Sequence, residues 1–383
     1  MKKDLTPTVR FDGYKKAWKK EKLSRIVDVK NGMDYKHLQR GDIPVYGTGG
    51  YMLSVNEALS YKDDAVGIGR KGTIDKPYIL KAPFWTVDTL FYAVPKENND
   101  INFVFGLFQN VDWKKKDEST GVPSLTKNAI NDTDVFVTDY VEQKTIGEYF
   151  KNFDDMIKLH QQEIDRLVCV RKAMIEKMFP QNGADVPAVR FGQYKEPWRL
   201  CQFSEIFKER HIIDTISDEY PQLAFTIEEG VIRPEDKKTN KRDFLIIDKA
   251  NKKYLQTEYD DIIYNPANVI YGAIHRNALG KGCVSPIYKI FYTDQDSTFM
   301  ECIVRHPRFI KEISRSMEGT VKKLRTLKPK AFLEKRAYIA PSIEEQQQIG
   351  EYFRQMDRLI EIEKEELEKI KHIKSACMEK MFV

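Results

Sequence analysis

A long stretch of this chain occurs twice. The residues from Asp139 to Phe179 recur, in register and without a gap, from Ser342 to Phe382, and about two in five are identical. Both copies contain Ile-Gly-Glu-Tyr-Phe near the start and close with Glu-Lys-Met-Phe. Similarity of this extent indicates an internal duplication, so the fold must accommodate two equivalent segments.

Each copy predicts one long helix. Neither contains a proline, and at 1.5 Å per residue each helix is about 60 Å long. A capping box supplies acceptors for the free N–H groups of the first turn, and its spacing is met by Asp139 with Glu142 and by Ser342 with Glu345.

The apolar residues of each helix form a seam at alternating steps of four and three, which is the heptad pattern of a coiled coil. A helix of this length cannot bury such a seam against itself, so we expect the two copies to pair. The seam residues are Ile146, Phe150, Phe153, Ile157, Ile164 and Leu167 in the first copy, and Ile349, Phe353, Met356, Ile360, Leu367 and Ile370 in the second.

Polar residues interrupt the seam at equivalent positions. His160 corresponds to Glu363, and Arg171 corresponds to Lys374. These side chains are either solvated or set the register of the pair. If the helices run antiparallel with their centres aligned, His160 and Glu363 lie within about one turn of each other.

A shorter repeat marks the start of each half. Val9-Arg10-Phe11 recurs as Val189-Arg190-Phe191, and a Tyr and a Trp follow at the same spacings. The predicted plan is therefore domain, helix, domain, helix, with boundaries at residues 1–138, 139–182, 183–340 and 341–383. The two domains contain short apolar runs and Gly-rich turns, which predict mixed α/β domains with twisted or barrel-like sheets. Among the expected elements are a helix over Phe103–Asn110 and strands over Glu258–Tyr264 and Val269–Ile274.

Composition and residue spacing indicate the compartment and the kinds of site that this chain can have. The five cysteines are scattered and lack a C-x-x-C pair, so no disulfide framework or metal site is expected. No apolar run is long enough to span a bilayer, and we expect a cytoplasmic protein with no membrane partner. Basic residues are concentrated in residues 1–40, which suggests a polyanionic partner.

Motifs for catalysis are incomplete. Gly67–Gly72 has the spacing G-x-G-x-x-G, but Thr73, Ile74 and Pro77 follow, which favours a hairpin over the helix that a dinucleotide site requires. Asn265-Pro266-Ala267-Asn268 lacks the second proline and the aromatic residue of an amino-methyltransferase motif and is interpreted as a turn. We therefore expect a binding protein and no enzyme.

Polar and basic residues on predicted turns are the candidate DNA contacts. Arg and Lys donate to guanine edges, Asn pairs with adenine, and glycine lets the backbone approach phosphate. A solvated turn charge is the alternative for each. The candidates are Tyr46, Gly47, Thr48, Arg70, Lys71, Thr73, Lys76, Ser119 and Thr120 in the first domain, and His275, Arg276, Asn277 and Lys281 in the second.

The ordered set of features resembles the specificity subunit of type I restriction-modification systems. The resemblance rests on Pro341–Gly350 with its helix and on the Asp139–Phe179 helix. It also includes Ile43–Tyr51, Gly67–Thr73, Phe84–Leu90 and Val284–Tyr288. It implies an α+β fold in which two α/β target-recognition domains are separated by two long helices forming an antiparallel coiled coil, with a pseudo-twofold repeat.

The resemblance also implies a function and partners. Each domain would read one half of a bipartite, asymmetric site in double-stranded DNA. The helices would dock two modification subunits, which methylate adenine N6, and two restriction subunits would translocate and cleave DNA. S-adenosylmethionine, ATP and magnesium would belong to those partners, and no cofactor to this chain. The alternatives are an orphan or fused-system specificity subunit that retargets another methyltransferase, a coiled-coil scaffold without a DNA role, and a self-contained methyltransferase or nuclease.

Overall fold

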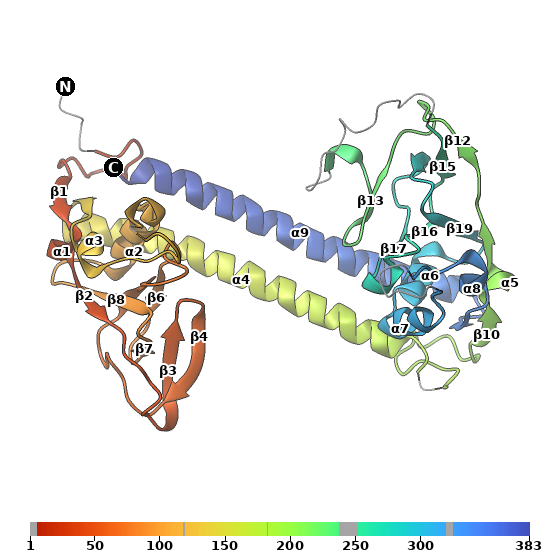
Figure 1. Ribbon diagram of the computed structural model, residues 1–383, viewed down its shortest axis with the longest axis horizontal. Helices are drawn as coiled ribbons and strands as arrows, with labels where there is room; N and C mark the ends of the chain where they lie inside the picture. The colour runs from red at the N-terminus through yellow and green to blue at the C-terminus, as the bar shows by residue number, and fades with distance from the viewer. Residues whose placement is uncertain (1–5, 118, 182, 237–251, 319–324) are drawn as a thin grey trace. The chain divides into compact units, whose positions relative to one another are not determined.

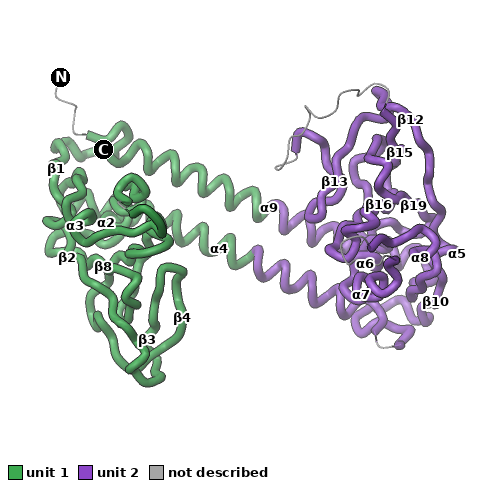
Figure 2. Tube along the Cα trace, in the orientation of Figure 1, with its two compact units in different colours: residues 1–163, 363–383 green, residues 164–362 purple. Residues whose placement is uncertain are grey.

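The computed structural model describes residues 6–117, 119–181, 183–236, 252–318 and 325–383. Two compact units make up the chain: residues 1–163 with 363–383, and residues 164–362 (Figure 2). The units differ from the predicted linear division because each long helix begins in one unit and ends in the other. No helix among the described residues is long and apolar enough to cross a membrane.

The first unit contains three small sheets. The largest is antiparallel, with strand order β2-β8-β5-β6, and the others have the orders β4-β3-β7 and β1-β9 (Figure 1). The strands are β1 Lys19–Lys22, β2 Val27–Asn31, β3 Arg40–Gly47, β4 Gly50–Val55, β5 Ala65–Gly69, β6 Tyr78–Leu80, β7 Trp85–Thr86, β8 Leu90–Pro95 and β9 Asp134–Val137. The helices are α1 Leu23–Ile26, α2 Ile101–Asn110, the 3-10 helix η1 Trp113–Lys116, α3 Lys127–Asn131 and the start of α4 Tyr140–Met178.

The second unit repeats the four-stranded sheet and the β1-β9 pair, and among its described residues it also has a wholly antiparallel three-stranded sheet and one further strand pair. Its sheets have the orders β11-β19-β16-β17, β12-β15-β18, β13-β14 and β10-β20. The strands are β10 Arg199–Gln202, β11 Phe207–Glu209, β12 Ile213–Asp214, β13 Ala224–Thr226, β14 Gly230–Ile232, β15 Tyr254–Thr257, β16 Ile262–Tyr264, β17 Ile274–Arg276, β18 Gly282–Val284, β19 Lys289–Thr293 and β20 Arg336–Ile339. The helices are α5 Phe203–Ile206, η2 Pro234–Asp236, η4 Val269–Tyr271, α6 Ser297–Val304, α7 Pro307–Arg315, α8 Pro329–Leu333 and α9 Ile343–Met381.

The helices α4 and α9 pair antiparallel within each unit. In the first unit, Asp154 contacts Lys374 and His160 contacts Glu363, so the partner number falls as the residue number rises. In the second unit, Leu167 packs with Met356 and Ile360. Most of the predicted seam residues are buried, whereas Phe153 and Ile157 are half-buried. The pairing expected of His160 and Glu363 is present, with 2.7 Å between Nδ1 and Oε2.

An identical joint attaches each domain to the helix that follows it. The carboxylate of Glu142 accepts from Arg10 Nε (2.6 Å) and Nη2 (2.7 Å), and Glu345 accepts from Arg190 in the same way (2.6 and 2.8 Å). Both glutamates are at most 1% exposed. The Arg of the short repeat is therefore the ion-pair partner of the Glu of the long repeat. Removing one partner of such a buried pair is expected to cost about 3–5 kcal/mol.

A glutamine and a glycine complete the joint. The backbone N–H of Asp100, which caps α2, donates to Gln143 Oε1 (3.1 Å), and a Cβ at Gly147 would lie 2.2 Å from the Asp100 carboxylate. Asp296, the cap of α6, has the same relation to Gln346 (3.1 Å) and Gly350 (2.3 Å). The repeated Glu-Gln and Ile-Gly motifs are thus explained by contact with the domain and not by helix formation.

The end of each helix enters the core of the other domain. Phe382, at the end of α9, packs against Trp18 (ring centroids 6.1 Å apart), Phe103 (5.5 Å) and Phe150 (5.6 Å) in the first unit. Phe179, after α4, makes the equivalent contacts in the second unit, with Trp198, Phe299 and Phe353. Val9 N donates to Lys380 O, and Val189 N donates to Lys177 O, which closes each unit in the same way.

Two local predictions have different outcomes. The stretch Gly67–Gly72 runs from β5 into a hairpin with β6, as expected, and no helix follows it. The strand predicted over Val269–Ile274 is wrong: residues 269–271 form a 3-10 turn, and Gly272 has a φ of +88°, which ends the turn before β17 begins. A left-handed glycine is incompatible with a continuous strand.

Candidate nucleic-acid interface

The loop between β5 and β6 carries the central group of predicted contacts in the first domain. Its backbone is held on two sides. Arg70 N donates to Thr89 O (2.8 Å), whereas Leu125 N donates to Arg70 O (2.9 Å) and Gly72 N donates to Pro123 O (2.8 Å). The loop is therefore fixed between the start of β8 and the segment that precedes α3.

That second segment includes the predicted contacts Ser119 and Thr120. The carboxylate of Asp117 accepts from the backbone N–H groups of Ser119 and Ser124, both at 3.0 Å. These hydrogen bonds hold the pKa of Asp117 below its ordinary value, because they stabilise the charged form. The Asp117 turn thus makes the segment a neighbour of the β5–β6 loop.

Tyr46, Gly47 and Thr48 lie at the end of β3. The Tyr78 hydroxyl donates to Gly47 O (2.6 Å), and Val87 N donates to Tyr46 O (3.0 Å). Burial raises the pKa of the Tyr78 hydroxyl, so the group stays protonated and remains a donor. The end of β3 is therefore fastened to the stretch that leads into β8.

Arg70 is attached to the same stretch. Its Nη1 lies 3.4 Å from Asp88 O, and its guanidinium lies 5.9 Å from the centroid of the Phe91 ring. Arg70, Lys71 and Lys76 are exposed, and among the described residues none of them forms an ion pair with a carboxylate. Their N–H groups are available to guanine edges or phosphate oxygens. The structure thus brings the first-domain candidates together on neighbouring loops.

Sequence reasoning missed a hollow beside the β3–β4 hairpin. Its volume is about 640 Å³, and Lys36, Arg40 and Tyr51 are among the residues that line it. All three are exposed. Antiparallel pairing, with Arg40 opposite Val55, brings the two sides of the hollow together. The turn at Gly49-Gly50 signals the hairpin, but no motif marks the two cations that precede it.

The second domain uses Asn277 for its own structure. The side chain is fully buried. Its Nδ2 donates to Thr257 Oγ1 (3.1 Å), Glu258 O (2.8 Å) and Gly280 O (2.7 Å), and its Oδ1 accepts from Gly280 N. This amide stabilises a turn and the end of β15, so it has no free edge for adenine.

His275 is also buried, with 3% of its surface exposed. Its Nε2 lies 2.8 Å from Ile227 O, and a Cβ at Gly230 would fall 2.5 Å from its ring. Burial lowers the pKa of His275 to about 4, and the charge of Arg305 acts in the same direction. His275 is therefore a neutral core residue at pH 7 and is not placed to contact DNA.

The two basic candidates of this domain are both paired. Arg276 Nη1 donates to Asp260 Oδ1 (2.8 Å), and the side chain of Arg276 is 10% exposed. Lys281 is exposed; its ammonium pairs with Glu219 and lies 5.4 Å from the centroid of the Tyr220 ring. Of the four predicted contacts in this domain, Lys281 alone is on the surface.

Sheet order locates the counterpart of the Arg70 loop in the second domain. The strands β16 and β17 occupy the places of β5 and β6, so the equivalent loop is Asn265–Ala273. Leu327 N donates to Pro266 O (3.0 Å), as Leu125 N does to Arg70 O in the first domain (2.9 Å). Tyr271 on this loop is 66% exposed. The Asn265 carboxamide accepts from Ala267 N and Asn268 N, which confirms the predicted turn. We therefore move the candidate interface of this domain from residues 275–281 to this loop.

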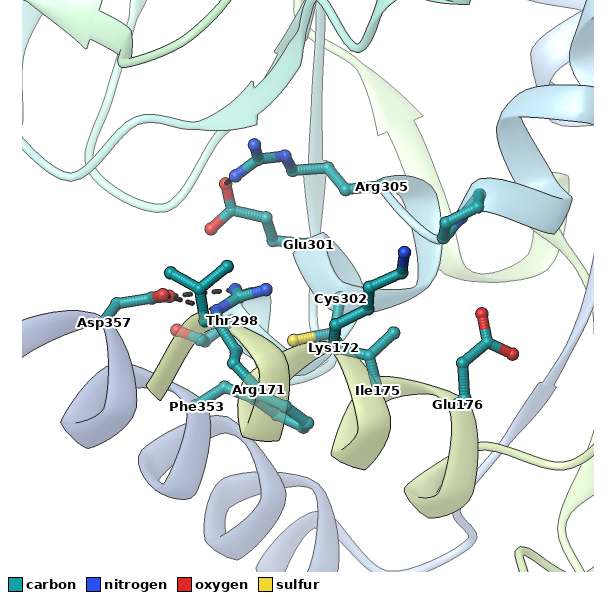
Figure 3. Close-up of a pocket in the computed structure, with 12 residues that line it drawn as sticks. Arg171, Lys172, Ile175, Glu176, Thr298, Glu301, Cys302, Arg305, Phe353 and Asp357 are labelled. Atoms are coloured by element: carbon teal, nitrogen blue, oxygen red, sulfur yellow. Dashed lines mark hydrogen bonds and ion pairs between the residues drawn. The ribbon is translucent and has the colours of Figure 1, made fainter. Parts of the chain in front are cut away.

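A hollow of about 240 Å³ lies where α6 meets the helix pair in the second unit (Figure 3). Arg171 donates from Nη2 to Asp357 Oδ2 (3.0 Å), and its guanidinium lies 5.6 Å from the centroid of the Phe353 ring. Arg305 pairs with Glu301 on another side of the hollow. A counterpart of about 350 Å³ in the first unit is lined by Phe150 and Asp154, the equivalents of Phe353 and Asp357. Because Arg171 and Arg305 pair with neighbouring carboxylates, we interpret these hollows as part of the packing between the helix pair and each domain. Among the described residues, no group of His, Cys, Asp or Glu side chains is placed to hold a metal ion.

Comparison with known proteins agrees with this architecture. Residues 15–168 match the family described as "Type I restriction modification DNA specificity domain". The type I restriction enzyme MjaVIII specificity subunit of Methanocaldococcus jannaschii is 22% identical over 286 residues, which are 69% of this chain and 65% of that protein. The chain thus spans about two-thirds of the length of that relative.

The fold has a solved counterpart. The crystal structure of the type I restriction-modification system S subunit from M. genitalium superposes with a TM-score of 0.68 at 14% identity and covers 99% of both chains. At this identity the likeness concerns the fold: α/β domains and long paired helices. Residues 15–168 thus match a type I restriction-modification DNA specificity domain, and the chain as a whole shares the fold of a solved type I S subunit.

Proposed function

We propose that this chain selects the DNA sequence on which a type I restriction-modification complex acts. Each domain reads one half of a bipartite, asymmetric target, and partner subunits methylate adenine N6 or cleave the DNA. The chain itself is not catalytic in this proposal. S-adenosylmethionine, ATP and magnesium belong to the partners.

One observation carries the proposal: two domains share a sheet order and a joint but differ in their loops. The strands β2-β8-β5-β6 and β11-β19-β16-β17 are equivalent, and the Glu–Arg joint is the same in both units. The Arg70 loop and the Asn265–Ala273 loop, in contrast, share no chemistry. Equal scaffolds with unlike loops are what reading two different half-sites requires, because base contacts specify sequence and the scaffold positions them.

The candidate loops of the first domain have the chemistry for direct readout. Arg70 is suited to guanine, while Lys71, Lys76 and the hydroxyl group of Thr120 are suited to phosphate; the Ser119 hydroxyl oxygen is buried and is not placed for such a contact. A wrong base pair at a contacted position is expected to cost about 1–3 kcal/mol. Lys36 and Arg40, beside the hairpin hollow, extend this cationic surface.

Exposed apolar residues on the helices support two equivalent partner sites. The predicted seam residues are mostly buried against the other helix and the domains, so they leave little surface for a further protein. Outside the seam, Met156 (44% exposed) and Leu159 (63%) have the counterparts Leu359 (48%) and Ile362 (43%) in the repeat. Val170 and Ile373, a further equivalent pair, are 37% and 52% exposed.

These residues divide equally between the two units. We call Met156, Leu159 and Ile373 the first-unit patch, and Leu359, Ile362 and Val170 the second-unit patch. Positions a whole number of heptads apart, such as 156 and 170, lie on the same side of a helix. Two equivalent apolar patches suit two copies of one partner, and we assign them to two modification subunits. Two restriction subunits join the complex through that assembly.

Methylome sequencing tests the proposed function. The chain is produced with its modification subunit in a host without other adenine methylation. We expect N6-methyladenine in a single bipartite motif, and a changed second half-site when residues 265–273 are replaced. The absence of duplex binding at low salt would instead favour a scaffold. Genes for modification and restriction subunits beside this one distinguish a complete system from an orphan subunit.

A further inference from the structure

Two equivalent residues of the repeat face each other in the first unit. His160 of α4 and Glu363 of α9 occupy the same position in the duplicated sequence, and their side chains meet with 2.7 Å between Nδ1 and Oε2. Both side chains are half-buried, with 28% and 27% exposed. Equivalent residues can meet in this way only at the centre of an antiparallel pairing. At this position, therefore, a residue of one copy of the repeat contacts its own equivalent in the other copy.

The ion pairs that flank the centre do not distinguish the copies. Arg171 pairs with Asp357 in the second unit, and Lys374 pairs with Asp154 (2.6 Å) in the first. Asp154 and Asp357 are equivalent, and so are Arg171 and Lys374. If α4 paired with the α4 of a second chain, Arg171 would still find Asp154. The same holds for Lys374 and Asp357 in a pair of α9 helices.

The apolar seam is equally permissive. Ile146 and Phe150 are repeated as Ile349 and Phe353, and the remaining apolar seam positions again hold apolar residues in both copies. The helix ends are also alike, since Phe179 and Phe382 pack on equivalent Trp and Phe residues. Neither these apolar positions nor the two flanking ion pairs therefore give α4 a reason to prefer α9 to a second α4.

The central pair, His160 and Glu363, does give α4 a reason to prefer α9. Pairing of like helices would set His160 against His160, which removes the carboxylate acceptor, or Glu363 against Glu363, which brings two carboxylates together. Like charges at facing positions are unfavourable, and a single polar position in a seam can decide which helices pair. We propose that the His160–Glu363 pair selects the pairing of α4 with α9 and disfavours pairing with the same helix of a second copy of this chain. Pairing of α4 with α9 lets one chain close on itself, so that each paired unit contains one copy of each of the two different domains.

The test cuts the covalent link between the two halves of the chain, so that the helix seam alone determines which helices pair. A protease site is inserted after Gly183 in the full-length chain, and the folded protein is cleaved there. The cleaved protein is unfolded in urea and refolded, and native mass spectrometry counts unlike pairs and both kinds of like pair. Once the linker is cut, the two halves no longer have the high effective concentration that favours pairing within one chain.

Four variants make the outcome decisive. The parent protein is expected to return to unlike pairs. His160→Glu and Glu363→His each make the centre identical in both copies, so the ratio of unlike to like pairs should fall about fivefold or more, the factor that about 1 kcal/mol produces. The exchanged variant, with His160→Glu and Glu363→His together, should restore the ratio of the parent protein. Lys158→Glu, an exposed charge reversal near the centre, should leave it unchanged.

The proposal is overturned if the single variants sort as well as the parent protein, or if the exchanged variant sorts no better than they do. Glu363→Gln keeps the shape of the side chain and replaces Glu363→His if that variant does not refold; it should also lower the ratio. Because the pair is partly exposed, high salt should weaken the selection in the parent protein. None of these readouts requires DNA or a partner subunit, so they are independent of the proposed function.

Discussion

At the scale of single residues, the geometry around Arg70 gives it the chemistry of a base contact. The side chain is exposed and held by one long hydrogen bond to Asp88 O (3.4 Å), so its remaining N–H groups are free to recognise a base. We expect Arg70→Ala to reduce discrimination in one half-site by about 1–3 kcal/mol, or roughly 5- to 150-fold, and to leave the other half-site unchanged. Methylation rates on duplexes with single base changes measure this.

Lys62→Ala is the control for Arg70→Ala, since Lys62 is also exposed and lies on the turn before β5. This control should not change discrimination at either half-site. Equal losses at both half-sites in the Arg70 variant would show that Arg70 supports the whole complex and does not read a base.

The buried imidazole of His275 makes stability depend on pH. Its pKa is about 4 in the folded chain against the ordinary 6.5, because burial disfavours the charged form. Between these values the unfolded chain binds a proton that the folded chain does not. The stability contribution is therefore complete above about pH 6.5 and is lost as the pH falls toward 4, by about 1.4 kcal/mol for each unit of difference in pKa. Burial lowers the pKa of His306 as well, which adds to the effect.

Urea unfolding at pH 7.5 and pH 5 checks this expectation. His275→Gln should narrow the difference in free energy of unfolding between the two pH values. His211→Gln, at an exposed position, should preserve it. An unchanged difference in the His275 variant would mean that other groups cause the acid sensitivity.

Residue chemistry read from sequence was misleading for Asn277, whereas the assignment of Arg70 as a base contact stays a prediction. Both side chains are recognised base readers, and both lie on turns. An Asn side chain, however, competes for its own backbone, and nothing in the local sequence shows whether the amide faces solvent or a neighbouring strand. Thr257, the last residue of β15, and Glu258, which follows it, accept hydrogen bonds from the Asn277 amide, and both are distant from Asn277 in sequence. A contact of that kind is set by the fold.

At the scale of elements, each helix end is part of the opposite domain. Phe382→Ala should destabilise the first unit by about 3–5 kcal/mol, because it empties a site among Trp18, Phe103 and Phe150. Hydrogen exchange should rise in residues 18–31 and remain unchanged in residues 198–209. Phe179→Ala is the matched variant and should give the reverse pattern. Both variants raising exchange in the same unit would contradict the exchanged packing.

The apolar patches on α4 and α9 predict the stoichiometry of the complex. Leu159→Glu and Ile362→Glu alter equivalent positions, so each should leave one modification subunit bound where the parent chain binds two. The double variant should bind none. Native mass spectrometry of the purified complex measures this. Lys158→Glu is the charge-matched control, and retention of two subunits by the double variant would place the partner sites elsewhere.

The long helices were predictable and several strands were not. The heptad seam and the capping residues predicted Asp139–Phe179, and α4 covers Tyr140–Met178. Such a pattern is local and repeats many times, so it is robust. The run Val269–Ile274 has the composition of a strand, but the left-handed Gly272 and the pairing of β16 with β17 interrupt it. Strand boundaries depend on partners that are distant in sequence, and those partners were not visible in it.

At the scale of the whole molecule, the equivalence of the two units predicts what half of the chain does alone. Residues 1–182 contain no α9 to pair with, so they should form a homodimer through the first helix even though His160 then faces His160, because Phe179 of one copy can take the place of Phe382 in the other. With the modification subunit, this dimer should direct methylation to a palindromic site made of one half-site repeated. Sedimentation and methylome sequencing measure the two outcomes. Recovery of monomers without methylation would show that the two helix ends are not interchangeable.

The hydrogen bond between Val9 N and Lys380 O has a consequence for synthesis of the chain. The core of the first domain contains Met378, Met381 and Phe382, which the ribosome adds after all other residues of that core. The second domain, by contrast, is assembled from one uninterrupted segment, residues 164–362. Translation therefore finishes the later domain first, and the earlier one keeps an incomplete core while residues 164–362 are added. A premature stop codon near position 377 would thus leave the core of the first domain incomplete, although that domain is translated first.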